Sequence, residues 1–152
     1  MTDEQLKADL RLRHPEADDG LEVKDFVWRY GSALDALMYA RLFWPAFFLE
    51  RGMIFTAHAV KDHGALDKIQ LSVSDPTETE KSFNLVELPY DLFNDLDMTD
   101  EQFDDLVERI REMWTARLQM LYPGQKFVVE VAPLDPSDPE SDLGLTVYQD
   151  RT

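Results

Sequence analysis

The stretch from Thr99 to Tyr122 constrains this chain most, because its apolar residues follow one helical stripe. They recur at intervals of three or four, which places them on one face of an α-helix. The stripe consists of Phe103, Leu106, Val107, Ile110, Met113, Trp114, Leu118 and Leu121. Thr99 and Gln102 have the spacing of a capping box, and Pro123 follows the last turn. At ~1.5 Å per residue, such a helix spans the width of a small domain.

The composition predicts one globular domain over residues 1–152. Hydrophobic residues make up 44% of the chain and aromatic residues 11%, which is enough for a substantial core. There is no cysteine, so disulfides, thiolate metal ligands and thiol nucleophiles are excluded. The first ten residues are acidic and polar, unlike a secretory or mitochondrial leader, and the longest apolar run, 42–49, is much shorter than the ~20 residues that cross a bilayer. We therefore expect a soluble cytoplasmic protein.

The formal net charge of −16 narrows the choice of partners. Nucleic acids and anionic membranes attract proteins through lysine and arginine, so this charge argues against both. It is compatible with a basic protein partner, with a divalent cation, or with solubility alone.

Three helical or extended segments are expected before the first hairpin. Residues 2–12 have the capping-box spacing and apolar edge of a short helix. Residues 23–30 place Phe26, Trp28 and Tyr30 at alternate positions, which predicts an extended segment. Residues 33–43 are apolar on most helical faces, which predicts a second, buried helix.

The strands are expected in two hairpins. Apolar runs on either side of Gly52 indicate a hairpin within 47–60, and residues 126–132 and 143–149 alternate as a second pair joined by the loop 133–142. Helical segments are predicted at 63–74 and 77–84, followed by an apolar link at 85–88. Together these elements predict an α+β fold in which the long helix, about 99–122, and the helix 33–43 pack on one small antiparallel sheet.

Acidic residues gather before and along the first half of the long helix. No basic residue occurs between Lys81 and Arg109. Asp100, Asp104 and Glu108 lie four residues apart, which stacks them on the helical face opposite the apolar stripe. The candidate partner-binding residues are Asp100, Glu101, Asp104, Asp105 and Glu108. The pattern is typical of a solvated helix face, and its functional interpretation is an anionic docking surface.

His58, Asp62 and His63 are the weak candidates for a metal site. A zinc site requires a third or fourth ligand at a recognisable spacing, and the sequence offers none, so surface histidines are the favoured interpretation. The acidic segment also fails as a calcium loop, because glycine and glutamate are missing at the positions an EF-hand requires. No metal and no cofactor are predicted.

The aromatic block 43–55 has two interpretations. It could form a hydrophobic patch for a partner or a second copy, or it could be core beneath the long helix. Core is favoured, because most Phe and Trp side chains are buried in domains of this size.

The sequence contains no motif of a known catalytic site. Gly-x-Ser-x-Gly, a phosphate-binding loop, a dinucleotide fingerprint and His-Glu-x-x-His are all absent. We therefore expect a non-catalytic interaction domain that docks a basic protein through the acidic helix face. The alternative is a small enzyme whose site is assembled from scattered Asp, Glu and His. The sequence leaves the oligomeric state open.

Overall fold

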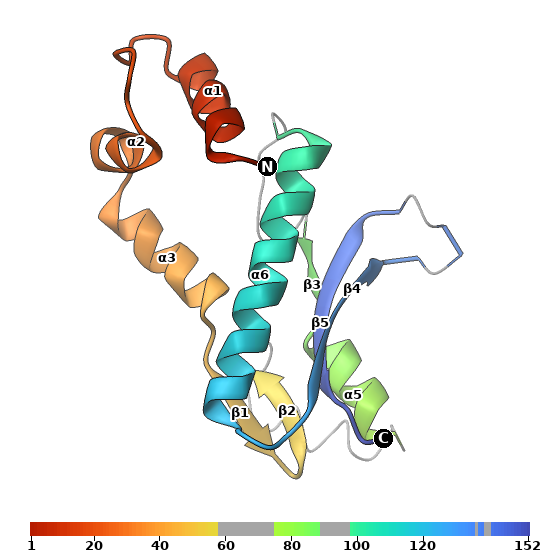
Figure 1. Cartoon of the computed structure of the whole chain (residues 1–152). Coiled ribbons are helices and arrows are strands. Elements are labelled where there is room, and N and C mark those ends of the chain that lie inside the picture. Colours follow the sequence, from red (N-terminus) through yellow and green to blue (C-terminus); the bar gives the residue numbers. More distant parts are fainter. Residues whose placement is uncertain (58–74, 89–97, 136, 139–140) are drawn as a thin grey trace.

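The computed structural model describes residues 1–57, 75–88, 98–135, 137–138 and 141–152. It begins with three helices, α1 (Asp3–Arg13), α2 (Val23–Tyr30) and α3 (Ala33–Phe43). Figure 1 shows them as an arch that starts beside the N-terminal end of α6 (Asp100–Leu121) and returns to it near the C-terminal end. A capping box begins α1, and the Ser32 hydroxyl accepts from the first backbone N–H groups of α3.

Five strands form two antiparallel sheets in the described residues. β1 (Phe47–Glu50) and β2 (Met53–Thr56) form a hairpin whose turn places Arg51 and Gly52 at positive φ. The second sheet has the order β3-β5-β4 and consists of β3 (Val86–Glu87), β4 (Phe127–Pro133) and β5 (Leu143–Gln149). β4 pairs with β5 along its whole length.

The core lies between α6 and the second sheet. The buried side of α6 presents Val107, Ile110, Trp114 and Leu118 to residues of β4 and β5 such as Val147. Trp114 is fully buried at the centre, and its ring meets Phe47 edge-on at 5.6 Å between centroids. Its indole Nε1 donates to the Leu42 carbonyl at 2.9 Å, which fixes the end of α3 against α6.

Helix α5 (Pro76–Phe83) joins the two sheets through buried polar side chains. The Asn84 side chain accepts from the Thr56 N–H and donates to the carbonyls of Ile54 and Val147. The carboxylate of Glu80 accepts from the Ile54 N–H at 2.7 Å and pairs with Arg151. These bonds satisfy backbone groups of both β2 and β5, so α5 connects sheets that share no ladder.

The α+β fold and most elements agree with the sequence prediction. The capping box of α6, the second hairpin, the helix at 2–12 and the short helix at 77–84 are confirmed, each within two residues. The first hairpin is confirmed too, but its second strand ends at Thr56, and residues 58–60 of the predicted range lie outside the described residues. The predicted helix at 63–74 lies outside the described residues.

Three predictions about single segments or their pairing are wrong. Residues 23–30 form a helix, because Phe26 and Tyr30 stack toward His14 at a helical spacing and Asp25 completes a capping box with Glu22. The two hairpins form separate sheets instead of one. Residues 86–87 within the predicted link pair with β5 as a strand.

The helix at 33–43 exists, but the prediction that it is buried is wrong. No residue of α3 is buried, and Leu34 and Leu37 expose 68% and 63% of their surface. Only its C-terminal end reaches α6, through Leu42 and the half-buried Phe43. The apolar residues of α3 therefore form an exposed surface and not a buried helix.

Candidate interaction surfaces

The acidic face, defined here as Asp100, Asp104 and Glu108, lies on the solvent side of α6. All three side chains are exposed, whereas Val107, Ile110, Trp114 and Leu118 of the same helix are buried. Within the described part of the chain, no ion pair reaches Asp100 or Asp104. Glu108 pairs with Arg111, and this guanidinium holds the pKa of the Glu108 carboxyl below its usual range. The face therefore combines two exposed carboxyl groups without an ion pair and one that is paired with Arg111.

The two adjoining candidates, Glu101 and Asp105, contact other parts of the protein. Glu101 accepts a hydrogen bond from the Gln5 side chain at 3.2 Å, so it helps to attach α1. Asp105 is half-buried and lies 3.3 Å from the Met1 nitrogen and 3.4 Å from Arg109. These two carboxylates are less available to a partner than Asp100 and Asp104, which have no ion pair in the described part of the chain.

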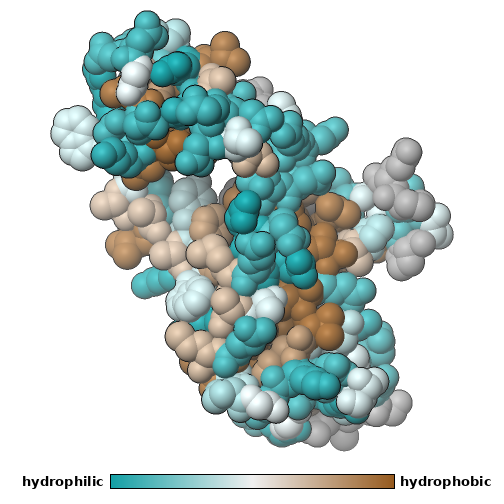
Figure 2. Space-filling model, viewed as in Figure 1, coloured by the Kyte–Doolittle hydropathy of each residue, from teal (hydrophilic) through white to brown (hydrophobic). Residues whose placement is uncertain are grey.

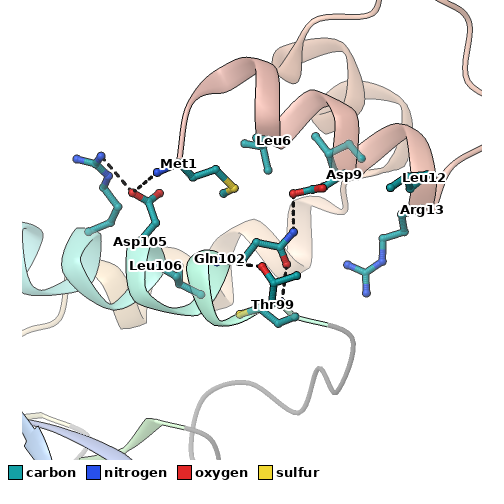
Figure 3. A pocket seen from close by; sticks show the side chains of 12 residues that line it. Met1, Leu6, Asp9, Leu12, Arg13, Thr99, Gln102, Asp105 and Leu106 are labelled. Atoms are coloured by element: carbon teal, nitrogen blue, oxygen red, sulfur yellow. Dashed lines mark hydrogen bonds and ion pairs between the residues drawn. The ribbon is translucent and has the colours of Figure 1, made fainter.

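A groove of about 610 Å³ separates α1 from the first half of α6 (Figure 3). Its lining is mainly apolar, with Leu6 and Leu106 on opposite sides. Its two carboxylates are both engaged: Asp9 accepts from the Gln102 amide at 2.6 Å, and Asp105 is paired as described above. The lining contains no histidine. This arrangement lacks the converging carboxylates or histidines that general acid–base catalysis requires.

The weak metal candidates His58, Asp62 and His63 lie outside the described residues. Within the described part, no three histidine or acidic side chains gather closely enough to hold a metal ion. None of the helices described there combines the length and apolar character that crossing a bilayer requires.

A second surface was not predicted from the sequence. We define the α2–α3 surface as the exposed apolar side chains Val27, Trp28, Leu34, Leu37, Met38 and Tyr39. Trp28 exposes 85% of its surface, and Figure 2 shows apolar side chains gathered over α3. The only signal for it in the sequence was the apolar character of 33–43, which we interpreted as burial.

Some aromatic residues of the block 43–55 are core residues, and one is exposed. Phe47 and Phe55 are core residues, as expected, whereas Trp44 remains 39% exposed at the end of α3. The block is thus mostly core, with Trp44 partly exposed at the end of α3.

Comparisons with protein-family models, with curated proteins and with solved structures find no match for this chain.

Proposed function

We propose that this protein is a non-catalytic interaction domain that docks a basic protein partner through the acidic face of α6. The observation that carries the proposal is the row of exposed carboxyl groups at Asp100, Asp104 and Glu108 on a helix that is anchored in the core by its buried residues. We place this activity in the cytoplasm.

The position of the row on a rigid element supports this function. Like charges four residues apart on a helix repel each other by a few tenths of a kcal/mol per pair. The helix N-terminus offsets part of this repulsion near Asp100, but Glu108 lies two turns further on. A partner with lysine or arginine at matching spacing would relieve the repulsion on binding.

An enzymatic function has weaker support. The groove between α1 and α6 is the larger of two concave sites described here, and its carboxylates, Asp9 and Asp105, are held by Gln102 and by Met1 and Arg109. A catalytic acid or base requires a group free to exchange a proton with a substrate.

The test is capture of basic proteins from a lysate by the wild type and by the variant Asp100→Asn, Asp104→Asn, Glu108→Gln. We expect the variant to lose most of the captured protein, with the largest loss at low salt, because exposed charges are screened beyond about 8 Å at physiological ionic strength. The fold should stay intact, since the three side chains avoid the core.

The control variant Asp18→Asn, Asp19→Asn, Glu78→Gln removes the same number of charges from exposed positions elsewhere. It should capture as much as the wild type. Equal capture by the wild type and both variants at low and high salt would mean that the acidic face serves only solubility.

A further inference from the structure

The α2–α3 surface is a large apolar area on a protein that is otherwise strongly charged. With full areas of roughly 150–250 Å² for large apolar side chains, its six residues together expose on the order of 800 Å². The largest apolar patch on a typical monomer covers about 300–600 Å². A stable protein–protein interface buries about 800 Å² on each partner, so this surface is large enough for one complete interface.

The charges around this surface differ from those of the whole chain. Residues 23–43 carry three basic side chains (Lys24, Arg29 and Arg41) and two acidic ones (Asp25 and Asp35), while the chain as a whole has a net charge of −16. Two copies of the protein repel each other over most of their surfaces, but this region is nearly neutral. It is therefore the region where two copies can approach at the lowest electrostatic cost.

The order of residues along α3 suits pairing with its own copy. Leu34, Leu37, Met38 and Arg41 follow the spacing i, i+3, i+4, i+7, which forms one stripe along the helix. Asp35 and Arg41 each lie three residues from Met38. In an antiparallel pair with its two-fold axis at Met38, Asp35 of each copy therefore lies level with Arg41 of the other.

We propose that the α2–α3 surface is the interface of a homodimer in which the α3 helices of two copies pack antiparallel across a two-fold axis near Met38. The interface is isologous, so each copy contributes the same apolar residues and both ends of two Asp35–Arg41 ion pairs. Trp28, at the edge of the surface, supplies a large aromatic anchor of the kind that dominates binding energy. This inference is independent of the proposed function, because it uses a different face of the molecule.

Sedimentation velocity over about a hundredfold range of protein concentration tests the dimer. We expect the wild type to shift from monomer to dimer and the variant Leu37→Glu to stay monomeric, because a dimer would bury two unpaired carboxylates. The control Met120→Glu changes a similarly exposed apolar residue at the far end of α6 and should dimerise like the wild type. A monomeric wild type throughout, or a Leu37→Glu variant that dimerises normally, would overturn the proposal.

A charge exchange tests the antiparallel register. Asp35→Arg or Arg41→Asp alone should weaken the dimer about threefold to tenfold, because each brings like charges together at two symmetric places. The double variant Asp35→Arg, Arg41→Asp restores opposite charges and should recover most of the affinity. A double variant weaker than both single variants would contradict the two-fold axis at Met38.

Salt separates this interface from the acidic face. Raising the salt from ~0.05 M to ~0.5 M should strengthen the dimer, because it screens the repulsion between two acidic copies. The same change should weaken capture of a basic partner. If the dimer does not strengthen at high salt, the homodimer proposal has failed. If capture of the basic partner does not weaken, the proposed docking through the acidic face has failed.

Discussion

Trp114 combines more stabilising contacts than other residues of the α6 stripe. It is fully buried, meets Phe47 edge-on and donates its indole hydrogen to the Leu42 carbonyl. The aromatic contact joins α6 to the start of β1, and the hydrogen bond joins it to the end of α3.

We predict that Trp114→Ala lowers the free energy of unfolding by about 3–5 kcal/mol, because it leaves a large cavity and an unpaired Leu42 carbonyl. Chemical denaturation measures this value. Met113→Ala, at the neighbouring and more exposed position, is the matched control and should cost less than about 1 kcal/mol. Similar values for both variants would show that Trp114 is not central to the core.

Asn84 has a comparable role among the polar residues. Its fully buried amide makes three hydrogen bonds to backbone groups of β2 and β5. We predict that Asn84→Ala costs about 2–4 kcal/mol of unfolding free energy, because one N–H and two carbonyls lose their partners in the interior. Ser82→Ala, at an exposed position of α5, should be nearly neutral. An equally mild Asn84→Ala would contradict the role of α5 in joining the sheets.

These two residues differ in how well the sequence reveals them. Trp114 belongs to a periodic apolar stripe, so its burial could be predicted from local spacing. Glu80 occurs in an ordinary polar helix and Asn84 directly follows it, and their roles arise from contacts with residues at least 26 positions away in the sequence. Local sequence patterns do not predict such contacts.

At the scale of elements, α6 owes its start to reciprocal side-chain caps. Thr99 accepts from the Gln102 N–H, and the Gln102 side chain accepts from the Thr99 N–H and donates to Asp9 of α1. We predict that Thr99→Ala lowers stability by about 1 kcal/mol, while Thr99→Ser, which keeps the hydroxyl, has little effect. Thermal unfolding of the two variants measures the difference. Equal destabilisation by both would indicate that the methyl group, and not the cap, matters at this position.

Each wrong prediction about an element has a physical cause. Eight residues at 23–30 fit both a strand period and a helical one, and contacts with His14 decide for the helix. For α3 the type and bounds were correct, but composition alone does not say whether an apolar helix is covered by its own chain or by another. The separation of the two sheets likewise depends on tertiary packing through α5.

At the scale of the whole molecule, the charge and the apolar area lie on different surfaces. The acidic face belongs to a helix anchored in the core, whereas the α2–α3 surface belongs to the arch beside it (Figures 1 and 2). The positions of the acidic residues on α6 followed from the sequence, but the contacts of Glu101 with Gln5 of α1 and of Asp105 with the Met1 nitrogen did not.

The most direct test of the account is the association rate of the protein with its captured basic partner as a function of salt. Wild type should associate at least about tenfold more slowly at ~0.5 M than at ~0.05 M salt, because electrostatic steering is screened. The variant Asp100→Asn, Asp104→Asn, Glu108→Gln should associate slowly at low salt and show a much flatter dependence, with unchanged thermal stability. Identical salt dependence for the wild type and this variant would contradict docking through the acidic face.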